Sequence, residues 1–492
     1  MHEPKWLQKI HTPHWLTVLL GLTILFRIPS FFEPYYYGDE MIYLTLGNAI
    51  RKGVTLYSQI YDNKPPLIYI LAAIAGNLFW FKVILAFWMV VTLILFWKLT
   101  TKLFEREILQ KIATITFAIL TTIPLLEGNT VNAELFMIGP TIAAFLILLN
   151  SPTYKKIFFA GILFSIATLF KVPGGASLPV IIFYWLITSN LNKKELLEIS
   201  KKTLYLIAGF IVPILLTFVW YGAHGALKDY FVEAFAQNLG YLSSFRPGDV
   251  QKSFVVRNAP LIMRAWIVVL GLIILRIKSK NLSKVFLLST IWLLFSLFAA
   301  TLSERPYPHY LVQALPSAAL LIAILGAFPT IEQALAVVPL FLAILVPVYF
   351  KFYYYPTFSY YNRFFSFATH KLTKEEYFNE FDKNVTSNYQ TASLLGSLAK
   401  PDDKVFVWGS DSPTIYALSR KLSPIKYVAS YHINDFSDKK TIASELEKTK
   451  PEWIVVLSGS EEFPELKNLA LKRYILVGTE TGANIWHLMG SL

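Results

Sequence analysis

Long apolar runs separated by short polar segments dominate the first 350 residues of this 492-residue chain. A helix that crosses a bilayer needs about 20 mostly apolar residues. We therefore expect a polytopic α-helical membrane protein with about eleven spanning helices. They are predicted over residues 14–32, 82–100, 112–127, 135–150, 157–170, 177–190, 203–221, 260–276, 285–301, 310–326 and 334–350. The first run has no small-residue cleavage site after it, so we interpret it as a retained helix.

One apolar segment, Pro65–Trp80, does not fit the spanning pattern because it has only 16 residues. Apolar stretches of that length are often interfacial or re-entrant. If the segment crossed the bilayer, the basic loop Lys98–Lys111 would face outward, against the usual bias of Lys and Arg towards the cytoplasm. We therefore expect juxtamembrane helices within a long first outer loop, residues 32–81.

The pattern changes from about residue 385, where short β-rich runs alternate with helical segments. Val405–Gly409 and Trp453–Leu457 are predicted strands, and Tyr474–Gly478 with Asn484–Leu488 is predicted to form a terminal hairpin. This alternation indicates a small α/β domain. We expect two parts: a transmembrane domain over residues 1–350 and an extracytoplasmic α/β domain over residues 351–492. No glycine-rich phosphate loop follows a strand, so no nucleotide site is assigned.

Composition and charge support this division. The chain is 55% hydrophobic and 16% charged, whereas a soluble domain has about 25% charged residues. Residues 351–492 are nearly neutral, with 17 basic and 16 acidic side chains, and residues 1–350 carry 28 basic and 16 acidic ones. The basic excess therefore sets topology and does not bind nucleic acid. The chain contains no cysteine, which excludes disulfide and thiolate chemistry.

Every second loop between the predicted spans is basic. With the basic loops inside, the N-terminus lies in the cytoplasm and residue 351 onward lies outside the cytoplasmic membrane. The basic positions are Lys5 and Lys9; Lys98, Lys102, Arg106 and Lys111; Lys155 and Lys156; Lys193, Lys194, Lys201 and Lys202; and Arg276, Lys278, Lys280 and Lys284.

Two adjacent carboxylates, Asp39 and Glu40, follow a run of three tyrosines in the first outer loop. A carboxylate at the membrane interface is partly desolvated, which raises its pKa towards that of a general base. Alternatively, Asp39 is the N-cap of a helix running from about Glu40 to Lys52, because Asp is a preferred capping residue. The sequence alone leaves both interpretations open.

Further polar groups fall in the predicted outer loops. A lysine at the mouth of an apolar segment suits a phosphate or snorkels to the interface, and Arg beside His suits a phosphate because Arg offers a charged fork of donors. Together these groups place acids, a Lys, an Arg and a His on one face of the membrane. Besides Asp39 and Glu40, the candidate substrate-binding residues are Asn63, Lys64, Asn132, Glu134, Arg305, His309 and Tyr310.

At these residues the chain resembles the GT-C glycosyltransferases, in particular the dolichyl-phosphate-mannose-protein mannosyltransferase-like group and the aminoarabinose transferase of lipid A. The resemblance covers most of residues 1–350. It rests on Asp39-Glu40, then Asp62-Asn63-Lys64-Pro65-Pro66, Asn132-Ala133-Glu134 and Pro308-His309-Tyr310.

The resemblance implies an inverting glycosyltransferase that takes a sugar from a polyprenyl-phosphate carrier at the outer membrane face. The acceptor would be a lipid, a cell-envelope glycan or a protein. Asp39 would deprotonate or orient the acceptor hydroxyl, and Lys64 and Arg305 would stabilise the leaving phosphate. Glu134 would bind the acceptor or position Lys64, although the family often has Asp there. No metal or other cofactor is expected, because this branch is thought to work without one.

Two other classes of protein remain open. A transporter would use intramembrane charges such as Arg27, Lys171 and Arg264 as a pathway. Its acids would lie near the middle of the bilayer, whereas the notable acids here fall in outer loops. A non-catalytic partner in envelope polysaccharide assembly is the third possibility, and it would make no glycosidic product.

Overall fold

The computed structural model describes residues 12–149, 151–240, 253–327, 330–479 and 482–490. Each of the eleven predicted apolar segments contains a helix. These helices are α1 (His14–Arg27), α4 (Leu78–Leu103), α5 (Glu107–Leu120), α6 (Ala133–Leu148), α7 (Tyr154–Phe170), α8 (Ser177–Thr188), α9 (Lys193–Ala223), α13 (Ala259–Lys278), α14 (Lys284–Ala300), α15 (Leu315–Leu325) and α16 (Ile331–Tyr349). Short helical segments connect some of them: η1 (Ile28–Phe32), η2 (Pro124–Leu126), η3 (Val172–Ala176), α10 (Leu227–Phe231), η4 (Val232–Ala236), α11 (Gln237–Gly240), α12 (Phe254–Arg257), η6 (Ser279–Asn281) and η7 (Pro308–Ala314).

The helices differ in how completely they can cross a bilayer by themselves. Six helical segments of the described chain are long and apolar enough: His14–Phe32, Leu78–Leu103, Lys193–Ala223, Ala259–Asn281, Pro308–Leu325 and Ile331–Tyr349. Others are shorter. α5, with 14 residues, rises about 21 Å, less than the ~30 Å hydrocarbon core. Non-helical backbone must cover the rest, and such backbone is tolerated where protein buries it.

The first outer loop folds into two short helices, α2 (Gly38–Arg51) and α3 (Leu67–Ala75). With nine residues, α3 is far too short to span, which agrees with the juxtamembrane prediction for this segment. It ends at Gly76, whose φ of 69° favours glycine, and the Asn77 side chain then caps α4. α4 therefore begins at Leu78, before the predicted span. α2 packs closely on α3 at Gly47, where a Cβ would lie 2.6 Å from the backbone nitrogen of Ala73.

The C-terminal part contains a four-stranded sheet in the order β1-β2-β4-β3. β1 (Val405–Trp408) runs parallel to β2 (Trp453–Leu457), and β3 (Tyr474–Gly478) forms the predicted antiparallel hairpin with β4 (Ala483–Leu488). Its helices, with the three that precede β1, are α17 (Thr357–Ala368), α18 (Lys374–Asn379), α19 (Val385–Leu398), α20 (Ser412–Ser419), α21 (Ser430–Phe436), α22 (Lys439–Thr449) and α23 (Pro464–Arg473).

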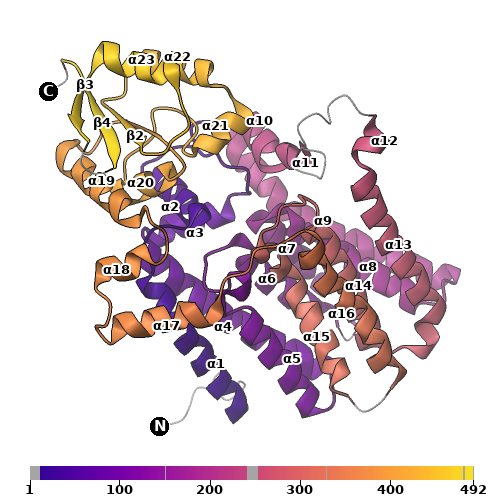
Figure 1. Ribbon diagram of the computed structural model, residues 1–492. Coiled ribbons are helices and arrows are strands. Elements are labelled where there is room, and N and C mark those ends of the chain that lie inside the picture. Colours follow the sequence, from indigo (N-terminus) through magenta and orange to yellow (C-terminus); the bar gives the residue numbers. More distant parts are fainter. Residues whose placement is uncertain (1–11, 150, 241–252, 328–329, 480–481, 491–492) are drawn as a thin grey trace, which may run out of the picture.

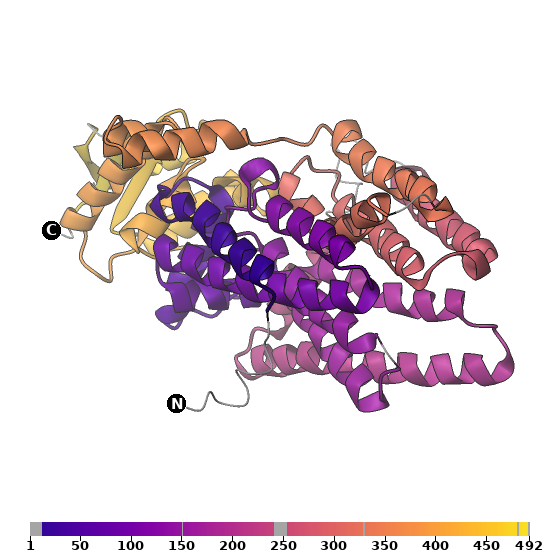
Figure 2. The ribbon, with the colours of Figure 1, turned by 90° about the horizontal axis from the view of Figure 1, so that it is seen from below.

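The sheet domain lies against the first outer loop. Figure 1 shows it above α2 and α3, and Figure 2 shows it at one end of the molecule. The Thr45 hydroxyl donates to the carbonyl of Pro413 at 3.2 Å, and the Tyr61 N–H donates to the carbonyl of Lys426 at 2.9 Å. These contacts fix the C-terminal domain relative to the loop that carries Asp39.

Candidate active site

A cavity of about 700 Å³ opens where many helix ends meet. Its wall includes the start of α2, the start of α6, the residue after α7, the end of α14 and the start of η7. Because consecutive spans alternate in direction, these ends all lie on one side of the helical bundle. The C-terminal domain contributes Tyr431, His432 and Asp435 to the same wall. The cavity therefore lies between the bundle and the sheet domain.

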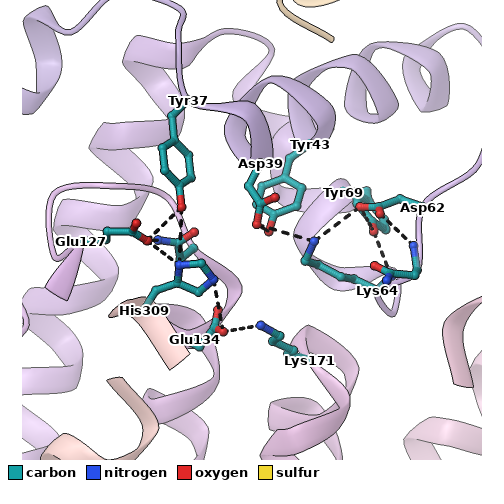
Figure 3. Close-up of polar contacts among 12 residues, drawn as sticks. Tyr37, Asp39, Tyr43, Asp62, Lys64, Tyr69, Glu127, Glu134, Lys171 and His309 are labelled. Atoms are coloured by element: carbon teal, nitrogen blue, oxygen red, sulfur yellow. Dashed lines mark hydrogen bonds and ion pairs between the residues drawn. The ribbon is translucent and has the colours of Figure 1, made fainter. Parts of the chain in front are cut away.

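Three charged side chains of the first outer loop form the first cluster in this cavity. Lys64 Nζ lies 3.6 Å from Asp39 Oδ2 and 3.7 Å from Asp62 Oδ2. Asp39 also accepts a hydrogen bond from the Tyr43 hydroxyl at 3.0 Å, and the Tyr69 hydroxyl donates to Asp62 at 2.7 Å. The cluster thus brings two predicted site residues, Asp39 and Lys64, into an ion pair (Figure 3).

Asp39 is not the N-cap of α2, so the capping interpretation is wrong. The helix starts at Gly38, its N-cap is Tyr37, and no side chain caps it. Burial alone would raise the pKa of the Asp39 carboxyl. The charges of Lys64, His309 and Lys171, with the Tyr43 hydrogen bond, outweigh burial and lower that pKa to about 2. Asp39 is therefore ionised at neutral pH and available to accept hydrogen bonds.

A second cluster crosses the cavity wall opposite the first (Figure 3). His309 pairs through Nδ1 with Glu127, and its Nε2 lies 3.8 Å from Glu134. Glu134 forms an ion pair with Lys171. The Tyr37 hydroxyl donates to Glu127 at 2.9 Å, which links this cluster to the start of α2. Two glutamates, a histidine and a lysine therefore form a continuous polar chain.

Besides Asp39, six of the eight other predicted site residues line this cavity, and two, Glu40 and Asn132, lie outside its wall. Glu134 does not contact Lys64 as one interpretation required, because it pairs with Lys171 instead. Lys171 Nζ also lies 4.0 Å from the centre of the Tyr310 ring. Asn132 is fully buried behind the wall and donates to Glu127 at 3.1 Å. The predicted residues that line the cavity with Asp39 are Asn63, Lys64, Glu134, Arg305, His309 and Tyr310.

Glu40 points away from the cavity into a buried ion cluster. Lys82 Nζ lies 2.6 Å from Glu40 Oε1 and 2.8 Å from Glu33 Oε2, and all three side chains are 0% exposed. Glu40 also accepts from the Val131 N–H at 2.6 Å, and Glu33 accepts from the Tyr360 hydroxyl at 2.5 Å. The geometry gives Glu40 a structural role beside Asp39 and does not support a catalytic one.

Sequence reasoning assigned no site role to several residues of the cavity. Lys171 was interpreted only as an intramembrane charge, yet it is the residue after α7 and faces Glu134. Glu127 sits in the acidic loop before α6, at a positive φ of 59°. His432 lies in the C-terminal domain, 4% exposed, with Nε2 3.7 Å from Asp62 Oδ1. The sequence could have indicated Lys171 and Glu127, because they are charged residues at the ends of predicted spans. It contains no comparable indication for His432.

The grouping of the acidic and histidine side chains bears on metal binding. In the described part of the chain, no three His, Asp or Glu side chains are grouped to hold an ion together. The carboxylates are instead paired with Lys64, Lys171 and His309.

The fold is similar to that of ArnT from Cupriavidus metallidurans. The crystal structure of ArnT bound to undecaprenyl phosphate aligns over 97% of this chain and 98% of that chain, with a TM-score of 0.56 and 11% identity. The apo ArnT structure aligns over 96% and 97%, with a TM-score of 0.54 and 11% identity. No family model and no curated protein matches the sequence. At this identity the likeness establishes the fold, a multi-pass helical membrane protein with a small C-terminal sheet domain, as the apolar runs and the strand pattern predicted.

Proposed function

We propose that the protein is an inverting glycosyltransferase that moves a sugar from a polyprenyl-phosphate carrier to an acceptor at the outer face of the cytoplasmic membrane. The Asp39–Lys64 pair in the cavity carries the proposal, because it sets a carboxylate beside an ammonium at one end of a helical bundle. The similarity of the whole fold to a protein crystallised with undecaprenyl phosphate supports a lipid-phosphate partner.

The chemistry follows from the two charged groups. Asp39 accepts the proton of the acceptor hydroxyl as its oxygen attacks the anomeric carbon. The new carbon–oxygen bond forms as the bond from that carbon to the phosphate oxygen breaks, and the bonding electrons leave with the phosphate. The growing negative charge is stabilised by Lys64 and Arg305. Attack from the face opposite the phosphate inverts the anomeric configuration.

The remaining cavity residues would bind the sugar and the acceptor. Asn63, Glu134, His309 and Tyr310 offer hydrogen-bonding groups to hydroxyls on the cavity wall. Lys171 forms an ion pair with Glu134 and so fixes its position on the wall. Asn132 supports the site from behind by its bond to Glu127. We propose that the reaction needs no metal or other cofactor, in keeping with the pairing of the carboxylates with cations.

The orientation is also a proposal. The cavity side of the bundle is opposite the side where the basic loops join α4 to α5, α6 to α7, α8 to α9 and α13 to α14. Basic loops favour the cytoplasm. We therefore propose that the cavity and the C-terminal domain lie outside and the N-terminus inside.

The transporter alternative fits the charges less well. Of the three charges it invoked, Arg27 is buried and donates to the carbonyl of Thr121 at 2.6 Å, and Arg264 lies 3.2 Å from Glu304. Only Lys171 reaches the cavity, at the end of its helix. The notable acids gather at one end of the bundle, whereas the coupling sites of many transporters lie near the membrane midplane.

Product analysis tests the proposal and separates it from a non-catalytic role. Membranes containing the protein are supplied with radiolabelled polyprenyl-phosphate sugars, and lipid-linked and polymer-linked products are separated by thin-layer chromatography. We expect label to leave the carrier with the wild type and to stay on it with Asp39→Asn, while both proteins accumulate equally. Equal sugar transfer by the two proteins would refute the role of Asp39 as the base. Absence of sugar transfer with both proteins would refute the proposed glycosyltransferase activity.

A further inference from the structure

Lys64 stands between two carboxylates that hold it in different ways. Its Nζ is nearly equidistant from Asp39 and Asp62, at 3.6 Å and 3.7 Å. Both distances exceed hydrogen-bonding range, so the ammonium is held by charge and not fixed to either oxygen. The Asp39 side chain is 26% exposed, whereas that of Asp62 is 2% exposed. A ligand entering the cavity therefore meets Asp39 more readily than Asp62.

Asp62 accepts a hydrogen bond at each of its two carboxylate oxygens. The Tyr69 hydroxyl donates to one of its oxygens at 2.7 Å, and the Asn63 N–H donates to the other at 2.8 Å. His432 Nε2 lies 3.7 Å away, and the His432 ring packs against Tyr61 with centroids 4.9 Å apart. Asp62 is therefore a fixed negative charge whose position depends partly on the C-terminal domain.

Asp39 is held far more loosely. Its carboxylate accepts a hydrogen bond from the Tyr43 hydroxyl at 3.0 Å and is otherwise held by the charge of Lys64. Lys64 is the largest of the charges that lower the pKa of Asp39 to about 2, against the opposing effect of burial. While Lys64 stays beside it, Asp39 is a weak base, and its oxygens are partly occupied by the ammonium.

A lipid phosphate entering the cavity competes for the same ammonium. The carboxylates of Asp39 and Asp62 beside Lys64 are both anions, so an approaching phosphate repels each of them. Asp39, the more exposed of the two, can move away more readily than the buried Asp62. Displacing Lys64 from Asp39 also exchanges a nearby positive charge for a negative one, which makes the carboxylate more basic.

We propose that Asp62 is the positioning residue that retains Lys64, and that the donor phosphate takes the place of Asp39 beside the ammonium. Donor binding thereby releases Asp39 to receive the acceptor hydroxyl. The inference rests on the proposed function and adds an order to it: the donor lipid binds first, and the base becomes competent only afterwards.

Affinity for undecaprenyl phosphate tests this inference without knowledge of the sugar or the acceptor. The full-length protein in nanodiscs is titrated with the lipid, and the variants Asp39→Asn, Asp62→Asn and Asp435→Asn are compared. Each variant removes one negative charge from the same cavity. We expect Asp39→Asn to bind about tenfold tighter than the wild type, which corresponds to about 1.4 kcal/mol. Asp435→Asn should change affinity less than threefold, and Asp62→Asn should show no gain.

A second measurement distinguishes positioning by Asp62 from a purely structural role. Tyr69→Phe keeps the Asp62 charge and removes only the hydroxyl that donates to it. In ³¹P spectra, the bound phosphate of the wild type should titrate below its usual second pKa of about 6 because Lys64 stabilises the dianion. The titration should move back towards ~6 in Tyr69→Phe, with the thermal midpoint unchanged.

The outcomes separate the inference from the function beneath it. Equal affinity gains for Asp39→Asn and Asp435→Asn would overturn the competition for Lys64, because they would reflect net charge alone. A gain for Asp62→Asn as large as that for Asp39→Asn would overturn the assignment of Asp62, as would a Tyr69→Phe spectrum identical to the wild type. A wild-type protein that binds no undecaprenyl phosphate would instead count against the proposed function itself.

Discussion

Replacing Lys82 by Met should destabilise the protein strongly, because Lys82 neutralises the fully buried carboxylates of Glu33 and Glu40. Its Nζ lies 2.8 Å from Glu33 and 2.6 Å from Glu40, and it donates to the carbonyl of Asn129 at 3.0 Å. Removing one partner from a buried ion pair costs about 3–5 kcal/mol, because an uncompensated charge remains in the interior. Met fills much of the space of the lysine stem, so the loss is chiefly electrostatic.

The matched control is Lys111→Met on α5. Lys111 Nζ lies 3.0 Å from Glu107, four residues earlier on the same helix, but these side chains are 35% and 61% exposed. An exposed pair of this kind contributes about 0.3–0.5 kcal/mol. The two variants therefore make the same chemical change in opposite environments.

The protonation of Glu40 determines how the stability of the Lys82→Met protein changes with pH. Burial, helped by the charge of Glu33 and opposed by that of Lys82, raises the pKa of Glu40 to about 7. Without Lys82, that pKa rises further above the unfolded value near 4.5. A carboxyl whose pKa is higher in the folded than in the unfolded state takes up a proton on folding. The Lys82→Met protein is therefore more stable at low pH and loses stability as the pH rises through the pKa of folded Glu40.

The assay is thermal unfolding of purified protein in one detergent, at pH 5.5 and pH 8. We expect a large fall in the unfolding midpoint for Lys82→Met at pH 8, a smaller fall at pH 5.5, and almost none for Lys111→Met. Adding Glu40→Gln to Lys82→Met should restore part of the loss, since one orphaned charge is removed. Equal midpoints for the two lysine variants at pH 8 would refute the reasoning.

Two further predictions concern packing and the C-terminal domain. Gly209→Val should prevent α9 from approaching α7, because a Cβ at Gly209 would lie 1.9 Å from the carbonyl oxygen of Phe158. Gly21→Val should have little effect, because the space around Gly21 is open. Fluorescence-detected gel filtration measures the yield of folded protein for each variant, and similar yields would contradict this prediction. Burial lowers the pKa of His432 to about 4, so acidification from pH 6.5 to 4 should cost up to about 3 kcal/mol of stability as the unfolded state takes up the proton. In His432→Gln, the thermal unfolding midpoint should fall less between pH 6.5 and pH 4 than it does in the wild type. An equal fall in the two proteins would contradict the burial of a neutral His432 imidazole.

The spanning helices could be predicted because each is encoded locally, by an apolar run between polar segments. The terminal hairpin and the juxtamembrane nature of α3 were predictable for the same reason: strand alternation and segment length are properties of neighbouring residues. α4 begins earlier than predicted because the cap at Asn77 follows directly on the turn at Gly76. Most of the fold could therefore be predicted from local sequence patterns.

The site could be predicted only in part. Which side chains face it depends on how each helix is rotated about its axis and on contacts between residues far apart in the sequence. Successive residues of a helix point about 100° apart, so Asp39 and Glu40 point in different directions, and only Asp39 lines the cavity. Which one does so depends on Lys82, a lysine within the apolar α4 that attracts Glu40 inward. Asp62 was visible in the sequence, but its partnership with His432 joins residues 370 positions apart in sequence and left no local signal.

The structure of the protein with undecaprenyl phosphate, determined by electron cryomicroscopy in nanodiscs, tests the central claim most directly. We expect phosphate density within about 3 Å of Lys64 Nζ, in the cavity beside Arg305, with the polyprenyl chain leaving between the spanning helices. We also expect that Asp39 has separated from Lys64 while Asp62 has not. A phosphate bound away from Lys64, or lipid density only on the basic side of the bundle, would contradict the account.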